Sequence, residues 1–270
     1  MSKKSIFQTK VLQKFFMLGL CCCLTLGVAG CASAKNDIQA ASYINDPLEP
    51  FNRGVFAFNN TLDRFLVEPT AKIYNAIFPD FFRDGVKNFM RNLRSPLIVA
   101  NNLLQGDFKD AGKATARFVI NTTAGIGGLI DVAAAQGFEY QPEDFGQTLA
   151  VWGFGDGFYL VLPILGPSSL RDGTGMAVDT FADPVRLYAF NRDEEWIYYT
   201  RNGVEGLDTR ARYVRAVEDL RRNSLDYYAA VRSAYAQKRK ALVRDENPDQ
   251  PRPEATVDYK NNYYYDAGWE

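Results

Sequence analysis

The sequence predicts an all-α protein with a single helical domain. After residue 50, apolar residues recur along much of the chain at steps of three and four, which is the period of one helical face. Capping residues precede several of these apolar segments. The main departure is the segment 145–167, which is rich in glycine, proline and large apolar residues. We therefore expect helices interrupted by one apolar loop.

The N-terminal segment has the pattern of a secretory signal peptide. Four lysines precede an apolar stretch, and Val28-Ala29-Gly30 precedes Cys31. The apolar stretch is too short for a spanning helix. Its order of charge, apolar core and small residues resembles the bacterial lipobox, in which the cysteine receives a diacylglycerol. We expect a signal peptide over 1–30, a diacylglycerol and an acyl chain on Cys31, and a polar tether over 31–45; a chance cysteine is the alternative.

Composition narrows the chemistry available to the mature chain. The expected signal peptide holds four of the 31 Lys and Arg residues and none of the 32 Asp and Glu residues, which leaves a net charge of −5. Nucleic acid is therefore not an expected partner. The chain has no histidine, and Cys31 is the one cysteine left after cleavage. Histidine-activated nucleophiles, ordinary zinc sites and intramolecular disulfides are excluded, so we expect no metal and no other cofactor.

The first helix is expected to begin at Asp46-Pro47-Leu48-Glu49. An acid at the N-cap, a proline at the first helical position and a glutamate at the third form a helix start. The apolar stripe that follows, from Phe51 to Phe65, lies on one helical face. This stripe would be core in a soluble protein and could face lipid in a bilayer.

Two further helices follow in the first half. One is expected from 80 to 105, with an interruption at Arg94-Ser95-Pro96. Gly106 is expected to end it, and Asp107 to cap a third helix over 108–123. Charged residues on the third helix, including Arg117, are expected to point outward.

The second half begins with the apolar loop. Residues 145–167 are expected to form a short helix, a Gly-rich turn and a hairpin-like loop over 158–165, which is either a buried connection or a membrane contact. Helices are expected from Ser168 to Asp183, over 193–222 and over 224–243. The helical domain then covers 46–244. A polar tail over 245–270 ends in aromatic residues to which we assign no role.

Six blocks of sequence, in order, resemble the VacJ family, also called MlaA. The blocks are NDPLEPFNR (45–53), RFVINT (117–122), GIGGLIDVA (125–133), EDFGQTL (143–149), LPILGPSSLRD (162–172) and DP (183–184). The resemblance implies a helical disc within the outer membrane of Gram-negative bacteria, beside a trimeric porin and with a central amphipathic channel. It also implies that mislocalised phospholipid is taken from the outer leaflet and delivered to a soluble periplasmic carrier, without catalysis.

The candidate site residues fall into three groups. Four are candidate head-group contacts, because a guanidinium can pair with phosphate and a polar path needs charged groups: Arg171, Asp172, Asp179 and Arg117. Their alternative roles are an ion pair at a helix start and a solvated helix face. Three glycines either line a narrow passage or permit close packing: Gly125, Gly127 and Gly128.

The third group is a candidate gate. Glycines at both ends of the apolar loop permit backbone rearrangements that a helix resists. The candidate gate residues are Gly157, Phe158, Leu160, Leu162, Pro163 and Leu165.

Two other functional classes remain as alternatives. A lipid hydrolase would need an acid and a base such as Glu143 and Asp144, yet adjacent acids on a helix point apart. A purely structural envelope lipoprotein would use the charged helix over 193–222 as its contact surface, which leaves the apolar loop without a purpose.

Overall fold

Helices make up most of the structure, a computed structural model that describes residues 45–245. The expected signal peptide, Cys31, the tether before Asn45 and the tail beyond Asp245 lie outside the described residues. The elements are α2 (Glu49–Leu62), the π-helical η2 (Asp63–Val67), α3 (Glu68–Ile77), α4 (Asp80–Gln105), α5 (Phe108–Thr123), α6 (Val132–Ala135), α7 (Phe145–Val151), β1 (Tyr159–Leu162), β2 (Gly166–Ser169), α8 (Leu170–Ala182), α9 (Pro184–Asn191), α10 (Trp196–Arg212), α11 (Val214–Asn223) and α12 (Tyr227–Val243). The predicted all-α class is confirmed, with one short two-stranded sheet within 45–245.

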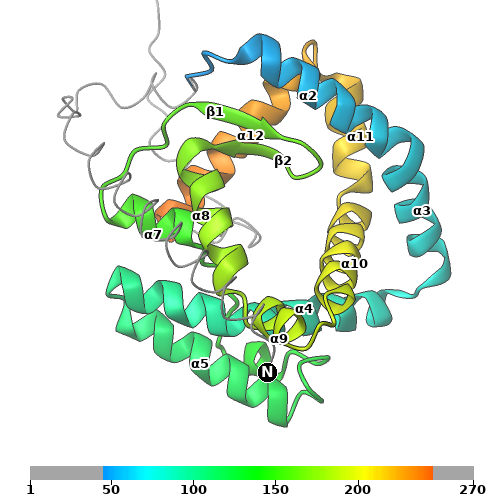
Figure 1. The fold of residues 1–270 in the computed structure, drawn as a ribbon. Coiled ribbons are helices and arrows are strands. Elements are labelled where there is room, and N and C mark those ends of the chain that lie inside the picture. Colours follow the sequence, from blue (N-terminus) through cyan, green and yellow to red (C-terminus); the bar gives the residue numbers. More distant parts are fainter. Residues whose placement is uncertain (1–44, 246–270) are drawn as a thin grey trace, which may run out of the picture. The chain divides into compact units, whose positions relative to one another are not determined.

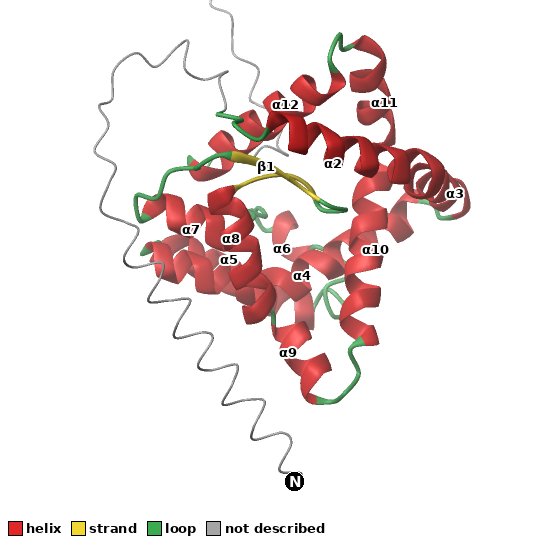
Figure 2. Cartoon of the chain, turned by 45° about the horizontal axis from the view of Figure 1, so that its top comes forward, coloured by secondary structure: helices red, strands yellow, loops and turns green. Residues whose placement is uncertain are grey.

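Within the described unit, the helices follow one another around the hairpin of β1 and β2 (Figure 1). α2, η2 and α3 form one curved course, and α3 packs against α10. α10 also contacts α4, which packs along α5 and against α7. α7 lies on α8, and α12 contacts both α7 and β2. Figure 2 shows α2 passing beside β1, so the first helix of the unit meets its hairpin directly.

The first helix starts later than its capping pattern predicts. α2 begins at Glu49, and its N-cap residue Leu48 provides no side-chain hydrogen bond. The predicted cap, Asp46, instead accepts hydrogen bonds from Asn52 Nδ2 and Arg232 Nη1, both at 2.8 Å. The guanidinium belongs to α12, which is distant in sequence, whereas capping rules consider only neighbouring residues. Asp46 therefore ties the start of α2 to α12.

The interruption predicted at Arg94-Ser95-Pro96 is wrong, because α4 runs unbroken through this segment. Proline removes one backbone hydrogen bond of a helix. α4 nevertheless packs along α5, and Ser95 Oγ donates to the carbonyl of Arg91 at 3.2 Å. The end of α4 follows the prediction: Gly106 has a left-handed φ of 83°, and the Asp107 side chain caps α5.

Three helices have no counterpart in the sequence prediction, and one predicted helix is divided. The unpredicted helices are α3, α6 and α9, and the long helix expected over 193–222 consists of α10 and α11. The break falls at Tyr213, which has φ of −96° and ψ of 11°. A one-residue break leaves the apolar period nearly intact, so the pattern does not reveal it.

The apolar loop predicted over 158–165 is an antiparallel β-hairpin, with Leu162 opposite Gly166 at its closed end. Tyr159 of β1 is fully buried and packs against Tyr228 of α12. Successive strand residues point to opposite faces, so one face of β1 belongs to the core and the other is half-buried.

Glycines bring α7 and α8 into backbone contact. A Cβ added to Gly175 would lie 2.3 Å from the backbone nitrogen of Gly146. A Cβ added to Gly146 would lie 2.8 Å from Asp172 Oδ1. Neither position has room for a side chain unless backbone or charged groups move. The two glycines therefore let the starts of α7 and α8 approach closely.

We predict that Gly175→Ala destabilises the protein by about 1–3 kcal/mol, because the added methyl group must force α7 and α8 apart. The matched control is Gly112→Ala on α5, where an added Cβ has no atom within 4 Å. Unfolding of the detergent-solubilised protein in denaturant measures both changes. Equal unfolding midpoints for the two variants would contradict the tight contact.

Candidate functional site

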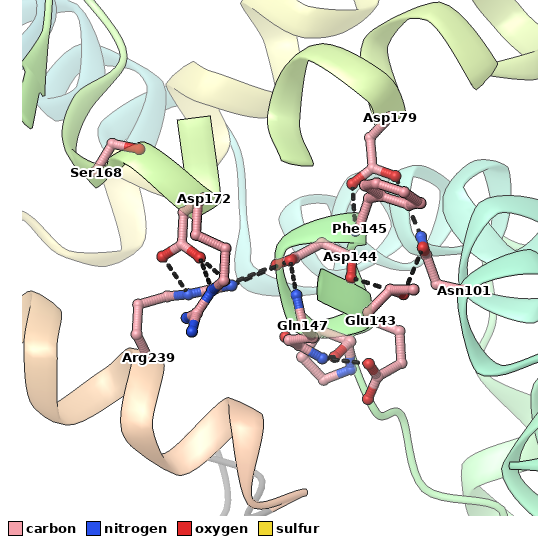
Figure 3. Close-up of polar contacts among 12 residues, drawn as sticks. Asn101, Glu143, Asp144, Phe145, Gln147, Ser168, Asp172, Asp179 and Arg239 are labelled. Atoms are coloured by element: carbon pink, nitrogen blue, oxygen red, sulfur yellow. Dashed lines mark hydrogen bonds and ion pairs between the residues drawn. The ribbon is translucent and has the colours of Figure 1, made fainter. Parts of the chain in front are cut away.

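The guanidinium of Arg239 joins three helices beside Asp172, one of the candidate head-group residues (Figure 3). Arg239 of α12 pairs through Nη1 with Asp144 Oδ2 at 2.6 Å. It also pairs through Nε with Asp172 Oδ2 at 2.7 Å, and its Nη2 donates to Asp172 Oδ1 at 2.9 Å. Asp144 caps α7 and Asp172 lies in the first turn of α8, so Arg239 binds both helix starts.

Local capping places these carboxylates. The Asp144 side chain accepts a hydrogen bond from the backbone of Gln147 at 2.9 Å, and Ser169 Oγ accepts one from the backbone of Asp172 at 3.1 Å. Burial is the largest single influence and raises the pKa of Asp144, but the hydrogen bond and charge of Arg239 and the N–H of Gln147 together hold that pKa below its ordinary value. The cap predicted at Ser168 is therefore supplied by the next residue along the chain.

Arg171 is buried and already paired. Its Nη2 lies 2.6 Å from Asp156 Oδ1, and its Nε donates to Asp172 Oδ1 at 3.2 Å. Tyr235 of α12 donates to the second oxygen of Asp172. The ion pair at the start of α8 thus exists, and Arg171 has no open approach to its guanidinium in this arrangement because its side chain is 6% exposed. Its role as a head-group contact stays a prediction.

The remaining acids of this region are held by amides. Asp179 accepts hydrogen bonds from Asn101 Nδ2 at 3.1 Å and from the backbone of Phe145 at 2.9 Å (Figure 3). Glu143 accepts one from Gln105 Nε2 at 2.9 Å and a second from Gln147. Burial raises the pKa of Asp179, and it raises the pKa of Glu143 to about 7.

Arg117 lies apart from this cluster and does not point outward, so that expectation is wrong. Its residue exposure is 6%, and its Nη2 lies 2.7 Å from Asp131 Oδ2. It also donates to the carbonyl of Phe138. Burial raises the pKa of Asp131, but the hydrogen bonds from Arg117 and Asn121 and the charge of Arg117 together make the net shift downward. The half-buried partner Asp131 follows α5 in a turn, and the helical pattern of α5 alone does not include it.

The three candidate glycines lie in that same turn. Gly127 and Gly128 have left-handed φ values of 69° and 97°. A Cβ at Gly128 would lie 2.5 Å from Asn92 Cβ, and one at Gly125 would lie 2.2 Å from the carbonyl oxygen of Ile130. Close packing therefore accounts for Gly125 and Gly128, and backbone conformation accounts for Gly127. The alternative role, lining a narrow passage, stays a prediction.

The candidate gate residues all belong to the hairpin and its N-terminal approach. Gly157 has φ of 70°, and Phe158, Leu160 and Leu162 are half-buried. Pro163 and Leu165 in the turn are exposed. Pro163 also lines an open apolar groove along α2, together with Pro50, Phe51, Gly54, Val55 and Phe58. The turn thus presents apolar side chains outward, and movement of this hairpin stays a prediction.

The apolar stripe on the first helix faces outward. Phe51, Phe58 and Phe65 are 62%, 56% and 82% exposed. The same holds for large apolar residues on other elements, such as Phe81, Phe108, Ile126, Leu165, Phe181 and Trp196. Among the described residues, buried polar and charged side chains outnumber buried apolar ones. This distribution reverses the usual one for a protein in water.

Neither a membrane-spanning helix nor a metal-binding group occurs in the described part of the chain. No helix within 45–245 combines the length and apolar character needed to cross a membrane. Within the same residues, no three side chains of the Cys, Asp or Glu type form a group that could hold a metal ion.

Together the fold and the site define a helical protein with an apolar exterior, an interior of paired charges and an apolar hairpin. The chain belongs to the MlaA lipoprotein family, whose model matches residues 44–242. It is 38% identical over 216 residues to the Escherichia coli (strain K12) protein named "Intermembrane phospholipid transport system lipoprotein MlaA", covering 78% of this chain and 82% of the relative. The Haemophilus influenzae protein of the same name is 36% identical over 228 residues, covering 82% and 87% of the two chains.

Two further comparisons agree. An uncharacterized protein of Rickettsia prowazekii is 36% identical over 248 residues, covering 88% of this chain and 97% of the relative. A solved structure described as "Structural basis for maintenance of bacterial outer membrane lipid asymmetry" matches with a TM-score of 0.66 and 37% identity, covering 74% of this chain and 99% of the other.

We predict a pH-dependent stability that comes from Glu143. Its pKa in the folded protein is about 7 against an ordinary value of 4.5, so the folded state keeps a proton that the unfolded state releases. Stability should therefore fall as pH rises from about 4.5 to about 7, and Glu143→Gln should lack this part of the decline.

The test is the melting temperature of the wild type and of Glu143→Gln, measured from about pH 4.5 to about pH 7. Glu195→Gln, at an exposed position, is the control. Parallel curves for the wild type and Glu143→Gln would show that Glu143 titrates normally.

Proposed function

We propose that this chain is an outer-membrane lipoprotein that removes mislocalised phospholipids from the outer leaflet and passes them to a soluble periplasmic carrier. The names of the E. coli and H. influenzae relatives, which call them intermembrane phospholipid transport lipoproteins, support this function. In this proposal the chain maintains lipid asymmetry by moving lipid toward the inner membrane, and it leaves the lipid chemically unchanged.

The observation that carries the proposal is the reversed distribution of side chains. Large apolar residues such as Phe65 and Phe81 are about four-fifths exposed, at 82% and 79%, while charged residues such as Arg171 and Asp172 are inside. An exterior of this kind is favourable against acyl chains and unfavourable against water, at about 25 cal/mol per Å² of apolar surface. The body of the protein is therefore suited to lie within the outer membrane.

Transport also requires a polar route for the head group. Exposing acyl chains to water costs about 0.8 kcal/mol per CH₂ group, which prevents unassisted transfer of a two-chain lipid. A polar interior surrounded by apolar helices can lead the head group past charged residues while the chains stay in apolar surroundings. The central amphipathic channel implied by the family resemblance would meet both requirements.

The proposed assembly has three further parts. A diacylglycerol and an acyl chain on Cys31 anchor the N-terminus. A trimeric porin lies beside the protein in the membrane, and the periplasmic carrier accepts the lipid on the other side. No metal, nucleotide or other cofactor takes part in this proposal.

Transport without chemistry fits the surroundings of the acids better than hydrolysis does. Glu143 and Asp144 take different partners, two glutamine amides and the guanidinium of Arg239. A hydrolase would need one of them to activate a water and the other to protonate a leaving group. Both are instead held by neighbouring side chains.

We predict that Cys31 carries the anchor. Cells fed a clickable palmitate analogue should label the wild-type protein, and Cys31→Ser should abolish the label and leave the signal peptide uncleaved. Mass spectrometry of the purified N-terminus provides an independent reading. A wild-type protein without label would disprove lipidation at this position.

We also predict that cells without the protein accumulate phospholipid in the outer leaflet and become sensitive to detergent with EDTA. Glu143→Gln should restore resistance as well as the wild type does, because the carboxyl has no chemical role. Release of fatty acid or lysophospholipid from vesicles by the wild type, and its loss in Glu143→Gln, would favour a hydrolase instead.

A further inference from the structure

Within residues 45–245, the outer edge of β1 is paired by side chains of α2 and by the carbonyl of Asn45, which accepts from the N–H of Tyr159 at 3.0 Å, and not by another strand. β2 occupies one edge of β1. On the other edge, Asn52 Nδ2 donates to the carbonyl of Tyr159 at 3.0 Å, and the backbone N–H of Val161 donates to Asn52 Oδ1 at 2.9 Å. One amide side chain thus makes both bonds that a residue of a neighbouring strand would make.

Asn59 repeats this pattern at the turn. Its Nδ2 donates to the carbonyl of Leu162 at 2.9 Å, and its Oδ1 accepts from the backbone N–H of Ile164 at 2.8 Å. Asn52 and Asn59 are seven residues apart, which is two helical turns and about 10.5 Å of rise. The peptide groups that they bind are centred at Leu160 on the strand and at Pro163 in the turn. We call each asparagine with its two hydrogen bonds to the hairpin a clasp, and both clasps are formed in the structure.

The second clasp holds a strained residue. Ile164 has φ of 66°, a conformation that is unfavourable for a β-branched side chain. Its side chain is also exposed, so packing does not hold it in place. The hydrogen bond from its N–H to Asn59 fixes the backbone in this conformation. Strain of this kind persists only where surrounding contacts impose it, and it is concentrated at functional sites.

We propose that Asn52 and Asn59 are positioning residues that make α2 and the hairpin one mechanical unit, with α2 setting where the apolar turn 163–165 stands. The proposal rests on the transport function proposed above and names the residues that position its apolar loop. Asn52 is the permanent clasp, because it is fully buried and also donates to Asp46. Asn59 is the releasable clasp, because it is half-buried and holds the strained turn.

The decisive comparison is Asn59→Ala against Asn60→Ala in the full-length lipoprotein. Asn60 is the next residue of α2, and its Oδ1 has no hydrogen-bond partner within residues 45–245. Both variants lose one amide from the same helix, but only Asn59→Ala frees the hairpin. Hydrogen–deuterium exchange of the peptide covering 159–165, in detergent micelles, reports on the clasp; resistance of cells to detergent with EDTA reports on transport.

We expect exchange in this peptide to become about tenfold faster in Asn59→Ala, which corresponds to the loss of about one net hydrogen bond. Asn60→Ala should leave both readings unchanged. Asn59→Asp keeps the acceptor for Ile164 but places an oxygen against the carbonyl of Leu162, so an intermediate exchange rate is expected. Exchange in the peptide covering 108–123 checks that each variant is folded.

Two results would overturn the proposal. One is unchanged exchange at 159–165 in Asn59→Ala. The other is faster exchange with cell resistance equal to that of the wild type, because the turn would then need no fixed position. If wild-type protein fails to restore resistance, the transport function itself is wrong, and the exchange measurement still decides whether α2 clasps the hairpin.

Discussion

The pairing of Arg239 with Asp144 and Asp172 is the interaction on which the remaining arrangement depends. It joins α12 to the starts of α7 and α8 at one point in the interior. Asp172 is buried, so removing Arg239 would leave this carboxylate without its compensating charge, which is destabilising. Gly146 and Gly175 provide the room, because a Cβ at either position would meet the acids or the facing backbone. The ion pairs of Arg239 and the two glycines are thus both needed for the close approach of α7 and α8.

The reversed distribution of side chains explains why amides and ion pairs take so many interior positions. If the exterior faces acyl chains, apolar burial inside gives little net gain, since the same residues are equally favourable outside. Specific contacts must then hold the helices together. Asn52 pairs the edge of β1, Asn101 binds Asp179, and Asn121 Oδ1 accepts from the backbone of Ala133. Each provides a hydrogen-bond partner for a buried or half-buried backbone or carboxylate group.

Local features of the fold could be predicted from the sequence, and contacts between distant elements could not. The boundary at Gly106 and Asp107 follows from short-range capping chemistry, and the hairpin follows from glycine and proline spacing. The cap at Asp46 failed because Arg232 competes for the carboxylate from 186 residues away. Arg117 was expected outside because its partner lies beyond its helix. Arg239 carried no signal, because one basic residue among several on a helix does not reveal a distant pair of acids.

The first helix shows most clearly what periodicity leaves undecided. A stripe of phenylalanines seven residues apart establishes that α2 has two different faces, but the spacing is the same whether that stripe faces a core or a bilayer. The polar face of α2 shows which side of the helix points inward. Asn52 and Asn59 repeat with the same seven-residue step, about 100° around the helix from Phe51 and Phe58, and they bind the backbone of the hairpin. A face that binds a strand edge must point inward, so the aromatic stripe is left outside. Paired polar residues at helical spacing are therefore as informative as the apolar residues beside them.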